Sequence, residues 1–229
     1  KVVTVYRKDE KHTLEPIPRV LARANTALQT LERYKERLDA VSGALTALEV
    51  EDLVTVRDAT TVLQRAEMVR RIAEELEGDV IELGADGRLV LLQLDALMVG
   101  VTEDRRYVAK DYGAGIGHDE LEEVLGQLAA LSTEELVDLG AVASAVDLPG
   151  GASLDAPVQS RGFRLLHKIP RLPDLVAENV VARFSNLQSV MRASIQDLDE
   201  VQGVGEARAR AIGEGLNRLA ETSILERYV

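Results

Sequence analysis

Apolar residues recur at alternating intervals of three and four along two stretches of the first eighty residues. This spacing predicts one helix from Pro18 to about Val41 and a second from Asp58 to Glu77. The apolar positions are Leu21, Ala24, Leu28, Leu31 and Leu38 in the first helix, and Ala59, Val62, Ala66, Val69, Ala73 and Leu76 in the second. A narrow stripe of this kind is typical of helices that pack antiparallel in a bundle or spine. A coiled coil that binds a partner is the alternative.

Other segments give shorter signals. Residues 121–131 return to the helical period, and Ser132 followed by Glu135 predicts a capping box that opens another helix. Two apolar runs between Val80 and Leu94 flank two glycines, a pattern compatible with a hairpin turn or with a helix break. The run from Val2 to Tyr6 is strand-like, but its surroundings offer no obvious pairing partner.

Composition favours an all-α protein. The 229 residues include only two Phe, five Tyr and no Trp, whereas strands favour aromatic and β-branched side chains. The chain has no Cys, which excludes disulfides, thiolate metal sites and cysteine nucleophiles and fits a reducing cytosol. No run approaches 18 consecutive apolar residues, so we expect neither a membrane span nor a secreted protein.

Charge is distributed unevenly along the chain. The net charge is −12, yet residues 158–229 hold ten basic and nine acidic side chains, against 17 and 30 in the preceding 157 residues. The change coincides with a loop rich in Pro and Gly between Asp147 and Pro157. We therefore expect a domain boundary near residue 152. The acidic average argues against a protein that coats nucleic acid by bulk charge.

Candidates for catalysis are few. His12, His118 and His167 lie far apart in sequence, and none belongs to a metalloprotease-like motif. His118 with the two acidic residues after it could ligate a metal, but a helix start is the better interpretation. The glycines between Gly113 and Gly117 lack the spacing of a dinucleotide-binding loop and the Lys of a P-loop. We expect a connector there, and no catalytic residue in this chain.

The strongest local pattern is the segment from Leu198 to Ile212. It predicts a helix, a tight turn in which Val204 lies between Gly203 and Gly205, and a second helix. The glycines permit positive φ and leave main chain uncovered, and free N–H groups at a helix start attract phosphate oxygens. This pattern resembles the helix-hairpin-helix motif, which binds DNA backbone without sequence preference. A Gly-Val-Gly turn with no ligand is the alternative.

Charged side chains flank this turn. Arg208 and Arg210 are candidate phosphate contacts. Compared with the motif, Ala207 stands where a Lys is common, and Glu206, where Pro is usual, would repel phosphate. We therefore expect weak binding that depends on salt. In related hairpins main-chain carbonyls bind a monovalent cation. The resemblance would assign that role to Asp199, Val201 and Val204.

A weaker copy of the pattern lies upstream, from Phe163 to Phe184. Arg171 and Pro173 replace the two glycines there, while Lys168 and Arg171 add cations. Two such units resemble the compact (helix-hairpin-helix)₂ domain, whose paired hairpins straddle the minor groove of a duplex.

The resemblance extends over the whole chain. The segments 24–34, 63–73 and 82–89, together with the C-terminal tail, are similar to the DNA integrity scanning family of bacterial diadenylate cyclases. The resemblance implies a fold that is mainly helical, with a strand remnant of the preceding cyclase domain in residues 1–15. A helical spine would follow in residues 16–152, and a (helix-hairpin-helix)₂ domain in residues 153–229.

The same resemblance implies a function. Family members condense two ATP into cyclic di-AMP with Mg²⁺ or Mn²⁺, form octamers and bind branched DNA, which inhibits them. The family's catalytic motifs do not occur in this sequence, so we expect a DNA-binding, regulatory part without cofactor. Expected partners are branched or junction DNA and further copies of the chain, with no membrane, in a cytoplasmic, nucleoid-associated protein. The alternative is a helical oligomerisation scaffold whose helix-hairpin-helix fold is inert.

Overall fold

The computed structural model describes residues 4–7, 10–13, 17–83, 87–113, 118–148 and 153–226. The part of the chain that it describes is mostly helical, as the composition indicated. In chain order the elements are β1 Thr4–Arg7, β2 Glu10–Thr13, α1 Ile17–Glu51, α2 Val56–Leu83, α3 Arg88–Met98, α4 Val101–Tyr112, α5 His118–Ala130, α6 Thr133–Val137, α7 Leu139–Ala145, α8 Phe163–His167, α9 Asp174–Phe184, α10 Leu187–Arg192, α11 Ile195–Asp199 and α12 Glu206–Glu226.

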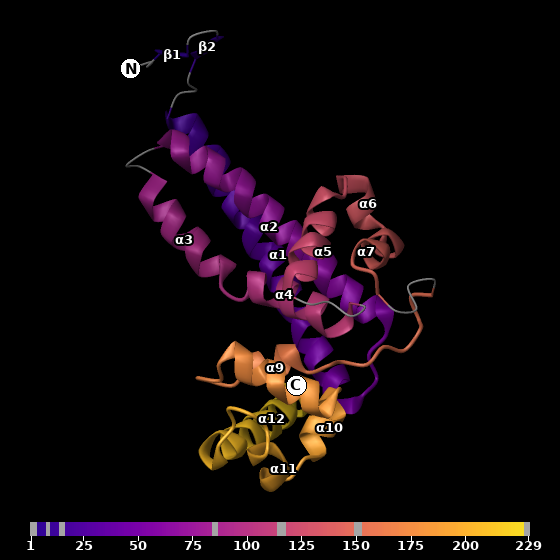
Figure 1. Cartoon of the computed structure of the whole chain (residues 1–229). Helices are drawn as coiled ribbons and strands as arrows, with labels where there is room; N and C mark the ends of the chain where they lie inside the picture. The colour runs from indigo at the N-terminus through magenta and orange to yellow at the C-terminus, as the bar shows by residue number, and fades with distance from the viewer. Residues whose placement is uncertain are drawn as a thin grey trace.

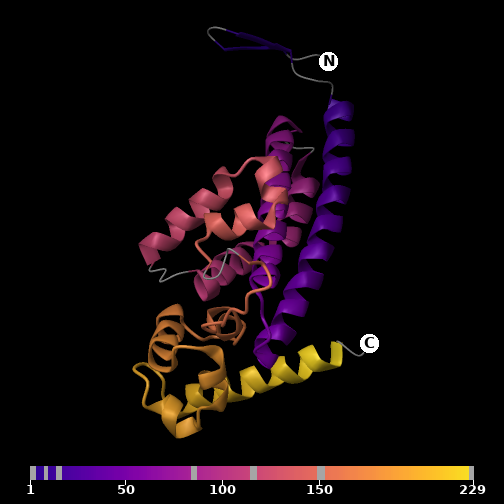
Figure 2. The same cartoon turned by 90° about the vertical axis from the view of Figure 1, so that its right-hand side faces the viewer.

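Helices α1 and α2 form the long axis of the molecule and lie side by side (Figures 1 and 2). Ten of the eleven apolar residues predicted for the two stripes have at most 5 % of their surface exposed, and the eleventh, Leu21, is partly buried. The two predicted heptad stripes therefore form one shared core rather than a surface left for a partner. Helices α3, α4, α5 and α7 add to this core, the larger of two.

The structure corrects one predicted helix end and decides two points that the sequence left open. Helix α1 continues ten residues beyond Val41, to Glu51, because Ser42 and Gly43 lie within the helix instead of ending it. The segment between Val80 and Leu94 is a helix break, since α2 runs to Leu83 and α3 begins at Arg88. The N-terminal strand does have a partner: β1 pairs antiparallel with β2, with Thr4 opposite Thr13.

The helix-capping box predicted from sequence is present in the spine. The Ser132 hydroxyl accepts a hydrogen bond from the Glu135 amide, and the Glu135 carboxylate accepts one from the Ser132 amide, which completes the predicted capping box of α6. The expected boundary at residue 152 and the glycines between 114 and 117 lie outside the described residues.

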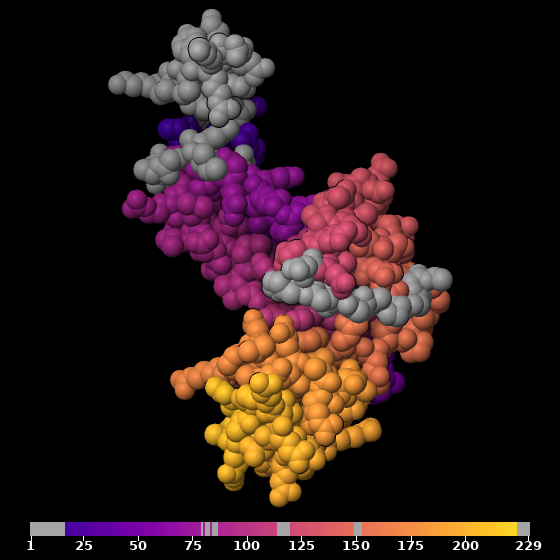
Figure 3. Space-filling view, in the orientation of Figure 1, coloured from indigo at the N-terminus to yellow at the C-terminus, as the bar shows by residue number. Residues whose placement is uncertain are grey.

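A second, smaller core gathers side chains from α8 to α12, together with Tyr107 of α4. Figure 3 shows these C-terminal helices as a lobe below the spine, and Figure 2 shows α12 passing beneath the lower end of α1. The lobe contacts the spine mainly through α8 against α4 and α12 against α1. The two cores therefore meet along α1 and α4.

A buried charged network joins the lobe to the spine. The guanidinium of Arg164 in α8, 2 % exposed, donates to both carboxylate oxygens of Glu49 in α1, at 2.6 and 3.2 Å. It also donates to the hydroxyls of Ser42 and Thr46. Tyr112 donates a further hydrogen bond to Glu49, at 2.8 Å. Because both charges are buried away from water, each depends on the other as its counter-charge.

Asp111 of α4 holds the start of α8. Its carboxylate accepts hydrogen bonds from the amides of Gly162, Phe163 and Arg164 at 2.7–2.8 Å, so it satisfies donors that the helix itself leaves free. Burial, and after it the charge of Glu49, raise the pKa of Asp111 to about 7, although the amides of Arg164 and Phe163 oppose the shift.

This shift gives a testable pH dependence. An unfolded Asp titrates near ~3.9, so between about pH 4 and 7 the folded chain binds the proton that the unfolded chain has lost, and stability falls as pH rises. We expect the stability advantage of wild type over Asp111→Asn to shrink by roughly 2–4 kcal/mol between pH 4.5 and 7.5. Urea unfolding of both proteins across this range measures it. A constant difference would mean that the three amides hold Asp111 ionised throughout.

Candidate nucleic-acid interface

The lobe contains two pairs of helices with matching geometry. Helix α8 ends at His167 and α9 begins at Asp174; helix α11 ends at Asp199 and α12 begins at Glu206. Both connections have six residues, and the start of α11, the end of α11 and the start of α12 each lie 32 residues after their counterparts in the first pair. The alignment of the two hairpins made from sequence thus matches the observed helix ends.

The two connections also share their main-chain hydrogen bonds. Ile169 donates to Leu166 as Val201 donates to Leu198, and Leu172 donates to Ile169 as Val204 donates to Val201. The apolar residues of both turns point into the smaller core: Val201 and Val204 are 5 % and 6 % exposed, and Ile169 is 3 % exposed. Val204, between the two glycines, is therefore directed inward.

Equivalent residues of the two turns adopt left-handed backbone. Gly203 has φ +85°, and Arg171, at the matching position, has φ +64°. Glycine adopts this conformation freely, whereas a residue with a Cβ atom bears a cost of about 1–2 kcal/mol. The first turn thus keeps the backbone shape of the second and adds an exposed cationic side chain.

Main-chain donors of the second turn lie on exposed residues. Gly203, Gly205 and Glu206 are exposed, and within the described part of the chain their amides donate to no acceptor. A Cβ atom built on Gly205 would meet nothing within 4 Å, so a side chain at this position would have open space. These donors lie at the N-terminus of α12, a helix of 21 residues, where the helix dipole favours an anion.

The predicted arginines are held close to this turn. Arg208 donates from Nη1 to the carbonyl of Gly203 at 2.7 Å, which leaves its other N–H groups for a ligand. Arg210 forms an ion pair with Glu206 at 2.5 Å, with both side chains more than half exposed. The acidic residue that stands in place of the usual proline is thus paired with a cation.

The two cationic side chains predicted for the first unit, Lys168 and Arg171, lie in different surroundings. Lys168 directs its ammonium toward the Thr46 hydroxyl of α1, at 3.4 Å, and so lies on the spine side of the lobe. Arg171 lies at the turn itself and is exposed. Pro170 and Pro173 have no amide N–H, so the first turn offers fewer main-chain donors than the second.

The residues expected to bind a monovalent cation lie at the end of α11 and in the turn that follows it. Of the residues whose carbonyls were expected to bind a monovalent cation, Asp199 ends α11, and Val201 and Val204 form the base of the turn. The carbonyl of Val201 accepts the bond from Val204. No group of three His, Asp or Glu side chains close enough for a metal occurs in the described part of the chain.

Two contacts important to the site were not apparent from sequence. The Asn179 side chain of α9 donates to the carbonyl of Gln202 at 2.9 Å and so joins the first helix pair to the second turn. Arg164, noted in sequence only as part of the first motif, is a buried anchor to the spine. Both contacts join residues that are far apart in sequence, and neither has a local pattern.

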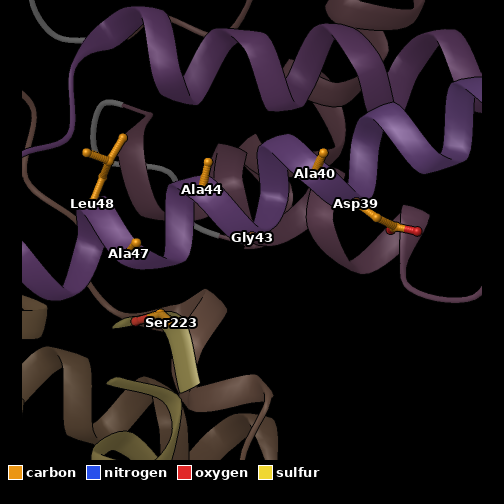
Figure 4. A pocket seen from close by; sticks show the side chains of 7 residues that line it. All are labelled: Asp39, Ala40, Gly43, Ala44, Ala47, Leu48 and Ser223. Carbon is orange, nitrogen blue, oxygen red and sulfur yellow. The ribbon is translucent and has the colours of Figure 1, made fainter. Parts of the chain in front are cut away.

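A groove between α1 and α12 is a separate feature of the lobe boundary. Figure 4 shows the residues of α1 that line this groove, most of them small, with Ser223 of α12 on the other side of it. Its lining residues are Asp39, Ala40, Gly43, Ala44, Ala47, Leu48 and Ser223. Asp39 is its one ionisable group, so the groove offers little for a charged ligand. Among the helices described, none combines the length and the apolar content that crossing a bilayer requires.

The fold and the turns define the class: a helical spine that carries two hairpin-linked helix pairs. A family model described as the DisA bacterial checkpoint controller linker region matches residues 14–154. The chain is 55 % identical over 232 residues to the DNA integrity scanning protein DisA of Acidothermus cellulolyticus, and 54 % identical over 231 residues to that of Kineococcus radiotolerans. Both alignments cover all of this chain and 63 % and 64 % of the relatives.

The chain therefore belongs to the DisA family, as the sequence resemblance indicated. It spans about three-fifths of the length of these curated relatives.

Proposed function

We propose that the C-terminal lobe binds the sugar-phosphate backbone of DNA through the turn between α11 and α12. One observation carries the proposal: Gly203, Gly205 and Glu206 are exposed residues at the start of a long helix, and their amides donate to no acceptor among the residues that the structure describes. Amides in this arrangement bind a phosphate oxygen by hydrogen bonds and by the helix dipole together. Contacts to backbone carry no sequence information, so we expect binding without sequence preference.

Side chains add to the main-chain contacts. Arg208 is preorganised by its bond to Gly203, and its free N–H groups lie beside the turn. Arg171, at the equivalent position of the first turn, would contact the second strand of a duplex. We give Lys168 a smaller part because its ammonium is directed toward α1.

The charge distribution fits this orientation. The lobe is nearly neutral whereas the preceding part of the chain is strongly acidic, so a DNA duplex would be repelled from the spine and would dock on the lobe. Branched DNA, whose arms diverge, would contact the lobe with the least approach to the spine. We therefore propose junction DNA as the preferred ligand.

The relatives' name supports a role in DNA integrity scanning. We propose that this chain is the DNA-sensing and connecting part of a diadenylate cyclase. Synthesis of cyclic di-AMP, with its ATP and divalent metal, would belong to the portion of the relatives that the chain does not span. The chain itself would have no catalytic role and would transmit DNA binding along its spine.

A substitution at Gly205 tests the proposal. Gly205→Glu adds a carboxylate within the turn, at a position where a Cβ atom has open space, so the fold should persist while a phosphate is repelled. We expect at least a roughly tenfold loss of affinity for a four-way junction, measured by fluorescence anisotropy. Gly126→Glu, on an exposed position of α5 where a Cβ atom also meets nothing within 4 Å, is the matched control.

Salt dependence is the second measurement. With about two or three phosphates neutralised, the logarithm of affinity should fall with a slope of roughly two to three against the logarithm of salt concentration. A Gly205→Glu protein that stays folded and binds the junction as tightly as wild type would refute the proposed interface, as would wild-type binding independent of salt.

A further inference from the structure

The connection between α11 and α12 contains a β-turn formed by residues 201–204. The amide of Val204 donates to the carbonyl of Val201 at 2.9 Å, and this bond closes the turn. Gly203, the third residue, has φ +85°, whereas Gln202, the second residue, is not one of the described residues with a left-handed backbone. Positive φ at the third position alone is typical of a type II turn.

The peptide between Gln202 and Gly203 has two possible orientations in a turn closed in this way. Type I and type II turns share their ends and their closing hydrogen bond, but they differ by a rotation of the central peptide through about half a turn. Because a trans peptide directs its C=O and its N–H to opposite sides, the rotation exchanges the places of these two groups. The choice of turn type therefore decides to which side the Gly203 amide points.

Side chains hold this peptide in its present orientation. Asn179 of α9 donates from its side-chain amide to the carbonyl of Gln202 at 2.9 Å, so the N–H of Gly203 is directed away from Asn179. The next peptide is held by Arg208, which donates to the carbonyl of Gly203 at 2.7 Å. Val176 of α9 also lies against the turn, since its Cγ2 atom is 3.3 Å from where a Cβ atom of Gly203 would be. The first helix pair thus supports the second turn.

We propose that Asn179 is a positioning residue for the phosphate-binding turn, because it keeps the peptide between Gln202 and Gly203 in the orientation that presents the Gly203 amide to a phosphate. This inference rests on the proposed contact between the turn and the DNA backbone. Glycine adopts positive and negative φ with similar ease, so Gly203 permits both orientations of the peptide. The hydrogen bond from Asn179 supplies the constraint that the turn's own residues lack.

The first turn reaches the same shape by a different route. Residues 169–172 also form a turn closed by a main-chain hydrogen bond, with φ +64° at Arg171. The second residue of this turn is Pro170, whose ring presets the φ that the position requires. The residue of α12 that lies 32 positions after Asn179 is Ala211, which has no side-chain donor. The turn with proline therefore lacks the equivalent hydrogen bond, and the turn without proline has it.

The test removes the donor and then restores the turn in another way. Asn179→Leu keeps a similar side-chain size but cannot donate, and we expect about three- to tenfold weaker binding of a four-way junction in fluorescence anisotropy. In Asn179→Leu/Gln202→Pro the proline should favour the type II turn, as Pro170 does, and should return the affinity to within about twofold of wild type. Asn217→Leu, at an exposed position further along α12, is the matched control and should bind as wild type does. Circular dichroism checks that the variants are folded.

Nuclear Overhauser effects report the shape of the turn with or without DNA. In a type II turn the second residue has ψ of about +120°, which brings its α-proton close to the amide proton of the third residue; in a type I turn the two protons are further apart. We expect a strong cross-peak between the α-proton of residue 202 and the Gly203 amide proton in wild type. The cross-peak should weaken in Asn179→Leu and recover in the double variant.

The outcomes separate this inference from the proposed interface. Gly205→Glu protein that binds as tightly as wild type refutes the interface, and the cross-peak then decides by itself whether Asn179 holds the turn. An unchanged cross-peak in Asn179→Leu would overturn the positioning role, as would full binding by Asn179→Leu when Gly205→Glu has lost it. A loss of binding that Gln202→Pro does not restore would also overturn it, because Asn179 would then act on DNA directly instead of through the turn.

Discussion

Replacing Arg164 by methionine is expected to lower the free energy of unfolding by about 3–5 kcal/mol. The substitution keeps much of the side-chain volume but removes the charge, so the Glu49 carboxylate, 1 % exposed, is left buried without its cation. The hydroxyls of Ser42 and Thr46 lose a donor at the same time. Urea unfolding monitored by circular dichroism measures the difference.

The pKa of Arg164 reflects how strongly the pair interacts. Burial alone would lower the pKa of Arg164, but the charge and hydrogen bonds of Glu49 and the charge of Asp104 outweigh burial and raise the pKa. The guanidinium is thus more favourable in this site than in water, provided that Glu49 is present. Removing either partner alone leaves the other as a buried charge without a counter-charge, and burial then becomes unfavourable.

The double variant Arg164→Met/Glu49→Leu separates the loss of a partner from the value of the pair. Because it removes both buried charges, we expect it to recover most of the stability lost in the single variant. Adding Tyr112→Phe removes the hydroxyl that would otherwise lack its acceptor. The exposed pair of Arg57 and Asp155 is the control, and Arg57→Met should cost less than about 1 kcal/mol. A loss at Arg164 as small as that at Arg57 would contradict the prediction.

The spine could be predicted from sequence because its determinants are local. Heptad spacing identified the buried faces of α1 and α2, and the Ser132–Glu135 pair identified the start of α6. The end of α1 could not be predicted in the same way. Ser42, which looks like a helix breaker, is retained within the helix, where its hydroxyl accepts from Arg164, 122 residues later.

The same distinction applies to the candidate site. The turn around Gly203 and its weaker copy around Arg171 were identified in sequence because a left-handed backbone and an inward apolar residue leave a local pattern. The orientation of Lys168 toward Thr46 depends on how the lobe docks on the spine. Position in the motif alone therefore did not predict this contact between the lysine and α1.

The spine contains a second buried charge whose removal should have a comparable effect. The Glu67 side chain of α2 is fully buried and lies among Arg70, Arg71 and Arg105, which approach its oxygens within 3.0 Å. Arg105 and Arg71 also donate to main-chain carbonyls of α5 and its end, so the cluster joins α2, α4 and α5. We expect Glu67→Met to cost about 3–5 kcal/mol, because three partly buried cations lose their shared counter-charge.

Titration provides the check on this cause. Burial would raise the pKa of Glu67, but hydrogen bonds from Arg70 and Arg71 and the charge of Arg105 outweigh it and lower the pKa. A depressed folded pKa contributes stability above the unfolded value near ~4.3 and loses it as pH falls through the folded value. The stability difference between wild type and Glu67→Gln should therefore be full at pH 7 and shrink below about pH 4. A difference that stays constant down to pH 2.5 would mean that Glu67 acts by packing alone, and that α2, α4 and α5 are held together without its charge.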